Sequence, residues 1–202
     1  MPGPANRVLD CAEGYLRLGM LEEALQELSS LKREEQFAAP ALQLRVAIFI
    51  QGKRWTEALE ASEALVIADP ETHHGYLHVS YCLHELGRTG EARDRLQKVP
   101  EFVRHQPLYC YNLACYEAQL GDHHSAEDWL EVAFSLDHSL IEVARTDTDL
   151  APLGELLEDL LAGFSDGGDA PVEEWDAEED EDWDDEEEEG GPWDDDDKSV
   201  PF

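Results

Sequence analysis

An alanine that recurs at a constant spacing of 34 residues is the feature that most constrains the fold of this chain. The four positions are Ala24, Ala58, Ala92 and Ala126. Glycine keeps the same spacing in three of the four units, at Gly19, Gly87 and Gly121, whereas the second unit has Gly52, one residue early. Repeats of this length hold two helices and a turn, so the sequence predicts a stack of similar helical units.

Other residue types also recur every 34 residues, and each such set of equivalent positions is called a column. These columns indicate which helix faces are buried. Small residues recur at Ala12, Val46, Ser80 and Ala114. Large apolar residues recur at Tyr15, Phe49 and Leu83, and Glu117 interrupts this column. Positions three, four and seven apart share one helix face, so the columns predict two helices per unit that cross closely at the alanine. The glycine ends the first helix, because it tolerates a left-handed backbone.

Four stretches that carry these columns resemble the tetratricopeptide repeat (TPR) family. They are Tyr15–Ala24, Gly52–Ala58 with the closing pair Asp69-Pro70, Leu86–Ala92 and Tyr111–Gly121. The resemblance implies an all-α protein, a right-handed α-solenoid of about four hairpins at residues 5–36, 39–70, 73–104 and 107–138. The match has departures, since the Asp-Pro pair is clear only once, Pro100 shortens the third unit and the link at residues 37–39 is irregular.

The apolar pattern places helices at residues 4–18, 21–35, 40–52, 55–68, 72–86, 89–98, 106–120 and 123–136. Residues 139–145 continue helically, and the stretch 147–149 can cap a final helix over residues 151–163. That helix has an apolar stripe of Leu153, Leu156, Leu157, Leu160 and Leu161. Because a repeat stack needs a cover at its end, residues 139–165 are expected to form a C-terminal capping segment.

Charge and composition exclude several classes of function. The 202 residues include 48 acidic and 14 basic side chains, for a net charge of −34, which repels nucleic-acid phosphates. No apolar run reaches the ~20 residues of a membrane span, and Met1–Arg7 lacks the apolar stretch of a signal peptide. The four cysteines contain no CxxC pair. We therefore expect a cytoplasmic protein that does not bind nucleic acid or membrane.

Residues 166–202 differ sharply from the rest, with 20 acidic residues and one basic residue, Lys198. Almost no aliphatic residues are available to offset the entropy of ordering, so the composition predicts a disordered acidic tail. Trp175, Trp183 and Trp193 interrupt the acidic runs and are candidate anchors for a basic, partly apolar surface. A solubilising role without a fixed partner is an equal alternative. The chain's own bases at Arg88, Arg93, Arg95, Lys98 and Arg104 are a third possible target.

The sequence gives little support for catalysis or for metal binding. His74 and His78 are four residues apart on one expected helix, but spacing supplies no third ligand, so we expect no metal site. The cysteines at Cys11, Cys82, Cys110 and Cys115 are interpreted as buried packing residues. No nucleophile motif or phosphate-binding loop is present. We expect a non-enzymatic protein without cofactor or small-molecule substrate.

The TPR resemblance implies instead a concave groove, lined by the first helix of each hairpin, that binds a peptide or helix. By register, the candidate groove residues are Gln43, Ala47, Ile50, His74, Leu77, His78, Tyr81, His84, Leu108, Tyr111, Asn112 and Cys115. The Lys, Arg and Asn that some relatives use to hold a chaperone's terminal carboxylate have no cationic equivalent here. The alternative is that several of these side chains pack under the terminal helix.

Two functional hypotheses follow. In the first, the protein is an adaptor or scaffold that binds a partner segment in its groove. In the second, it is a chaperone-like escort of a basic client, with the acidic tail supplying much of the attraction. Salt should weaken the second mode steeply and the first only slightly.

Overall fold

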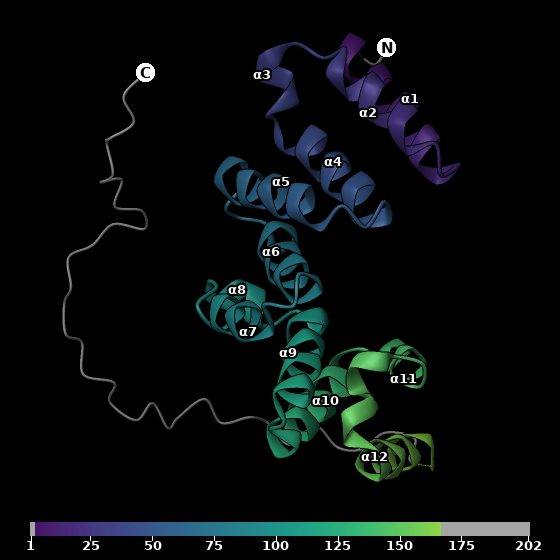
Figure 1. The fold of residues 1–202 in the computed structure, drawn as a ribbon, viewed down its shortest axis with the longest axis vertical. Helices are drawn as coiled ribbons and strands as arrows, with labels where there is room; N and C mark the ends of the chain where they lie inside the picture. Colours follow the sequence, from purple (N-terminus) through teal and green to yellow (C-terminus); the bar gives the residue numbers. More distant parts are fainter. Residues whose placement is uncertain (1–2, 167–202) are drawn as a thin grey trace, which may run out of the picture. The chain divides into compact units, whose positions relative to one another are not determined.

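The computed structural model describes residues 3–166, and all the regular structure in this range is helical (Figure 1). The long helices are α1 (Pro4–Arg17), α2 (Leu21–Ser29), α4 (Ala39–Gln51), α5 (Trp55–Ala68), α6 (His73–Glu85), α7 (Thr89–Gln97), α9 (Pro107–Leu120), α10 (His123–Leu136) and α12 (Glu155–Asp166). The short ones are α3 (Arg33–Gln36), α8 (Glu101–Arg104), α11 (Ser139–Ala144) and the 3₁₀ helix η1 (Thr148–Leu153). No helix within this range is long and apolar enough to cross a membrane.

The long helices form four hairpins, α1–α2, α4–α5, α6–α7 and α9–α10, that stack in chain order (Figure 1). Each hairpin contacts the next: α4 lies against α1 and α2, α6 against α4 and α5, and α9 against α6 and α7. The predicted all-α stack of helical hairpins is therefore confirmed.

The repeated alanines lie at the centres of the hairpins. Ala24, Ala58, Ala92 and Ala126 are fully buried, as are Ala12, Val46 and Ala114 of the small-residue column. Small side chains allow helix axes to approach to about 8–10 Å, so the 34-residue period is the period of these helix crossings. Ser62, one helical turn after Ala58, is also fully buried, and its hydroxyl donates to the Ala58 carbonyl oxygen at 2.7 Å.

The turn within each hairpin contains one left-handed residue. Gly19, Gly87 and Gly121 have φ values of 73°, 75° and 89°. In the second hairpin, however, Lys53 takes this conformation with φ 53°, while Gly52 has φ −81°. The expectation that Gly52 supplies the left-handed residue was wrong. Its lack of a side chain has another use, because a Cβ there would lie 3.2 Å from the Leu21 Cδ1 atom of the preceding hairpin.

Two predicted helices needed correction. The helix expected over residues 21–35 is broken, since α2 ends at Ser29 and α3 begins at Arg33. The Ser29 and Ser30 hydroxyls donate to the Gln26 and Glu27 carbonyls, which competes with continuing the helix. The final helix begins at Glu155 rather than at residue 151, and the preceding residues form η1.

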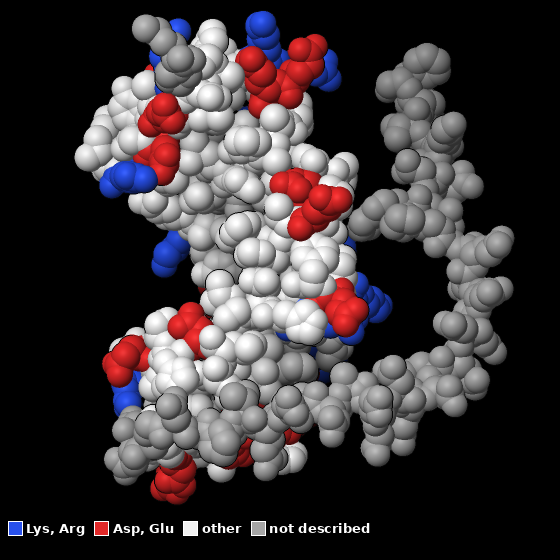
Figure 2. Space-filling model, turned by 180° about the vertical axis from the view of Figure 1, so that it is seen from behind, with Lys and Arg blue, Asp and Glu red and all other residues white. Residues whose placement is uncertain are grey.

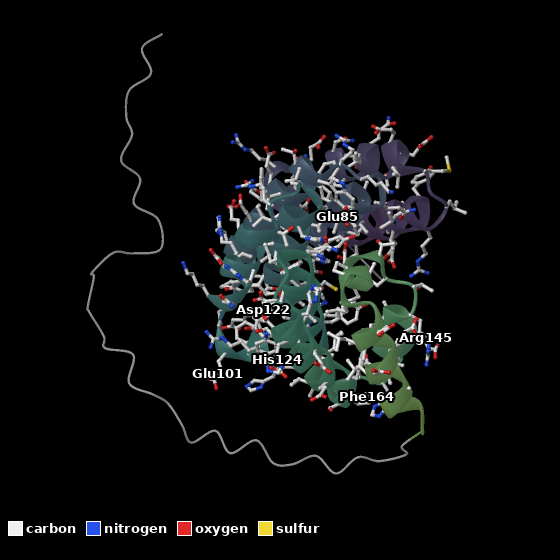
Figure 3. All side chains as sticks on the ribbon, turned by 60° about the horizontal axis from the view of Figure 1, so that its bottom comes forward. Glu85, Glu101, Asp122, His124, Arg145 and Phe164 are labelled. Atoms are coloured by element: carbon white, nitrogen blue, oxygen red, sulfur yellow. The ribbon has the colours of Figure 1, made fainter. Side chains whose placement is uncertain are left out.

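The C-terminal elements pack against the last hairpin. Helix α12 contacts α10, and the Phe164 ring lies edge-on to the buried Phe134 ring with centroids 5.4 Å apart. Figure 3 labels Phe164 on this helix. Leu153, Leu160 and Leu161 of the expected apolar stripe are buried, but Leu156 is exposed. Apart from Asp166, the predicted acidic tail with its three tryptophans lies outside the described residues.

Candidate binding groove

Two hollows lie along the first helices of the hairpins. The first, of about 400 Å³, lies between α1 and α4 and is called the N-terminal hollow. Its lining residues are Leu9, Asp10, Glu13, Leu16, Pro40, Gln43, Leu44 and Ala47. The second, of about 270 Å³, lies between α4, α6 and α9 and is called the histidine hollow. Its lining residues are Ile50, His73, His74, Leu77, His78, Tyr81, Leu108 and Asn112.

Nine of the twelve groove residues expected from the sequence line these hollows. Gln43 and Ala47 line the N-terminal hollow. Seven line the histidine hollow: Ile50, His74, Leu77, His78, Tyr81, Leu108 and Asn112. His73 was missed because the helical register was counted from His74, although His73 is the first residue of α6.

The other three expected groove residues, His84, Tyr111 and Cys115, face the chain's own segment before and within η1. The Tyr111 hydroxyl donates to the Asp147 Oδ2 atom at 2.7 Å, and the Cys115 thiol lies 3.8 Å from the same oxygen. His84 Nε2 lies 3.1 Å from the Asp149 Oδ2 atom. These three side chains therefore contact a folded-back acidic segment rather than an open surface.

The acidic segment is held by several further contacts. The Asp147 Oδ1 atom accepts a bond from the Asp149 backbone N–H at 2.9 Å, and Gln119 donates to the Asp149 carbonyl at 2.8 Å. Leu150 and Leu153 of η1 are buried against the last hairpin. Asp147 thus caps η1 instead of the final helix, and the segment closes the end of the groove next to the histidine hollow.

The histidines of the hollow are arranged in series along α6. The ring centroids of His73 and His74 lie 4.2 Å apart, and those of His74 and His78 lie 6.5 Å apart. Burial, together with the charges of the neighbouring His74 and His73, lowers the pKa of His78 to about 4. Burial also lowers the pKa of His73. His78 is consequently neutral near pH 7 and offers one hydrogen-bond donor and one acceptor.

Two tyrosines border the same region. Burial raises the pKa of the Tyr81 hydroxyl, and the Glu85 carboxylate raises it further through a hydrogen bond and its charge. Burial and the bond to Asp147 raise the pKa of Tyr111. The Tyr81 ring is also fixed edge-on to Trp55, with centroids 5.8 Å apart. Both phenols are therefore neutral hydrogen-bonding groups at physiological pH.

Metal and thiol chemistry find little support in residues 3–166. This part of the chain contains no group of three or more His, Cys, Asp or Glu side chains placed to hold a metal ion. All four cysteines are free, and burial raises the pKa of Cys82 and Cys110 to about 11, so both remain thiols. Cys11 was expected to be buried but is exposed, because it lies on the outer face of the first helix.

The stacked hairpins, their buried alanine crossings and their left-handed turns define this protein as a TPR-like helical repeat protein. A solved structure matches it over most of its length, the one described as a functional characterization of Pseudomonas aeruginosa PilF. The TM-score is 0.62 at 19% sequence identity, and the match covers 83% of this chain and 78% of that chain. No family model matches the sequence, and no curated protein sequence matches it either.

This likeness concerns the fold. A shared fold does not by itself assign a function, because one fold can carry many unrelated sites.

Proposed function

We propose that this protein is a non-enzymatic adaptor or scaffold that binds a peptide or helix of a partner protein in the histidine hollow. The observation that supports it best is that three successive first helices, α4, α6 and α9, contribute apolar side chains and neutral polar groups to one surface depression. Such a combination suits a protein segment, since apolar burial provides affinity and a few hydrogen bonds provide orientation.

The size and exposure of the hollow favour a side-chain anchor over a small molecule. Its volume of about 270 Å³ is below the range of roughly 300–1,000 Å³ for small-molecule sites. Leu108 is 50% exposed at its edge, an apolar surface that a partner can cover. His78, Tyr81 and Asn112 provide neutral donors and acceptors beside it.

A pair of substitutions on one helix tests the proposal. Leu108→Gln changes the hollow, whereas Leu120→Gln changes a leucine of similar exposure that does not line it. Partners captured by the full-length protein from its native cells should be lost with Leu108→Gln and retained with Leu120→Gln. Equal capture by both variants contradicts binding in this hollow, provided that both variants melt at the wild-type temperature.

The escort of a basic client is the second candidate, and the composition of residues 166–202 supports it. Twenty acidic side chains attract a basic protein, and Trp175, Trp183 and Trp193 add apolar anchors. Replacing the three tryptophans by alanine in the full-length chain should weaken client binding, as should raising the salt from low to physiological concentration. Binding that tolerates both changes would leave the tail without this role.

A further inference from the structure

We infer that the partner segment is apolar in its centre and carries Lys or Arg at both ends. This inference rests on the proposed function and specifies the chemistry of the partner. Three properties of the groove carry it: one face of α4 contributes residues to both hollows, both ends are acidic, and no Lys or Arg of the described residues lines either hollow.

Helix α4 joins the two hollows. Gln43 and Ala47 line the N-terminal hollow, and Ile50 lines the histidine hollow. These positions are four and three residues apart, so they share one face of the helix. At 1.5 Å per residue, Gln43 and Ile50 are separated by about 10 Å along the axis. A single partner segment of about ten residues can therefore contact both hollows.

The end of the groove at α1 is acidic. Asp10 and Glu13 line the N-terminal hollow together with Leu9, Leu16 and Leu44. Glu13 is paired with Arg17, but both side chains are largely exposed, so this pair is weak. Asp10 has no basic neighbour in the lining. A cationic side chain that enters here would gain two carboxylates beside an apolar surface.

The opposite end is acidic because the chain folds back on itself. The carboxylates of Asp147 and Asp149 face the side chains of Tyr111 and His84. Glu85 ends α6 and is labelled in Figure 3. Both Glu85 and Asp149 act electrostatically on Tyr81, which lines the histidine hollow. Their field therefore reaches the site where a partner would bind.

The middle contributes no opposing charge. Among residues 3–166, the linings of the two hollows include no Lys or Arg. The low pKa of His78 keeps its imidazole neutral at physiological pH. On the face seen in Figure 2, acidic (red) and basic (blue) side chains are scattered over the surface with uncharged areas between them. A segment with acidic ends would be repelled at both ends, whereas Lys or Arg would be attracted.

Matched synthetic peptides test the inference with the full-length protein. Three fluorescent peptides of twelve residues share one Leu- and Phe-containing centre and carry two Lys, two Gln or two Glu residues at each end. We expect fluorescence anisotropy to show at least tenfold tighter binding of the Lys peptide than of the Gln peptide, and weaker binding of the Glu peptide. Raising the salt to 0.5 M should reduce these differences, because it screens charges beyond a few ångströms.

Substitutions separate the groove from the acidic tail, which also attracts Lys peptides. The triple variant Asp10→Asn, Glu13→Gln and Glu85→Gln should lower the preference for Lys over Gln, measured as the ratio of the two dissociation constants, at least threefold. The control variant Glu60→Gln, Glu71→Gln and Glu131→Gln removes three exposed carboxylates that do not line either hollow. It should keep the wild-type preference, although it makes the net charge less negative by the same amount.

The outcomes distinguish a failure of the inferred charge preference from a failure of binding in the groove. Equal effects of the triple variant and its control would overturn the inference, because the preference would then come from the net charge or the tail. Equal binding of all three peptides, lost with Leu108→Gln, would overturn the inference and support the groove. Binding of no peptide, or binding insensitive to Leu108→Gln, would overturn the groove and the inference together.

Discussion

Gly75 allows α6 to approach α5 of the preceding hairpin closely, and its replacement by alanine should destabilise the protein. A Cβ atom at this position would lie 2.9 Å from Val66 Cγ2, 3.0 Å from Val66 N and 3.3 Å from Val66 Cα. Two of these three atoms belong to the backbone of α5. A change of side-chain rotamer at Val66 cannot relieve the overlap, so α5 and α6 must separate.

The magnitude follows from two opposing effects. Overpacking of a core contact costs about 1–3 kcal/mol. Replacing a helical glycine by alanine contributes about 0.5–1 kcal/mol in the other direction. The net loss in free energy of unfolding should therefore lie between about 0 and 2.5 kcal/mol, centred near about 1 kcal/mol. For a protein of this size, a loss of about 1 kcal/mol corresponds to a fall of roughly 2–4 °C in Tm.

Gly14 provides the matched control. It lies within α1, and a Cβ atom there would meet nothing within 4 Å. Gly14→Ala should therefore raise the free energy of unfolding by about 0.5–1 kcal/mol, in chemical denaturation followed by circular dichroism. If Gly75→Ala proved as stabilising as Gly14→Ala, the close contact between α5 and α6 would be refuted. Val66→Ala should not rescue Gly75→Ala, because the backbone contacts remain.

Three further predictions concern the turn, the hollow and the C-terminal helix. Lys53→Gly should raise the free energy of unfolding by up to about 1 kcal/mol, because it removes the cost of a left-handed lysine; an unchanged or lower midpoint in chemical denaturation would contradict this. Above pH 6.5, His78 is neutral in both the folded and the unfolded chain. As the pH falls from 6.5 towards 4, this histidine takes up a proton first in the unfolded chain, so the free energy of unfolding decreases. His78→Gln should therefore reduce the loss of stability measured between pH 7 and pH 4 by up to about 3 kcal/mol, and an unaltered pH profile would argue against a buried neutral imidazole. Phe164→Ala should cost about 1–3 kcal/mol and expose α12 to limited proteolysis, because it removes the ring packed on Phe134; wild-type resistance would show that this ring does not hold α12 against the last hairpin.

Local signals determined most of the helices. Ala58 and Ala92 could be recognised as crossing points because only a small side chain fits between helices at close range, and each is fully buried. The break after Ser29 was missed, because serine is tolerated within helices and the deciding hydrogen bonds form only in the folded turn. Gly75 belongs to none of the repeated columns, and its necessity depends on the distance to a backbone in another hairpin.

Glu117 is a second residue whose role the sequence alone does not explain and the tertiary structure does. Its position interrupts a column of large apolar residues, so the sequence marks it as an exception without a reason. In the structure Glu117 is buried and its Oε2 atom lies 3.6 Å from the Arg93 Nη1 atom of α7. A buried carboxylate is tolerated only with such a partner, and no spacing rule predicts which arginine provides it.

By itself, the sequence determined the helical hairpins, their stacking and nine of the residues that line the hollows, because a 34-residue period repeats the same local packing in each unit. Only the tertiary structure decided where the groove ends. The segment with Asp147 and Asp149 folds back onto Tyr111 and His84, residues 36 and 65 positions earlier in the chain. A contact of that kind depends on the path of the whole chain, whereas periodicity reports only the neighbours within each helix and hairpin.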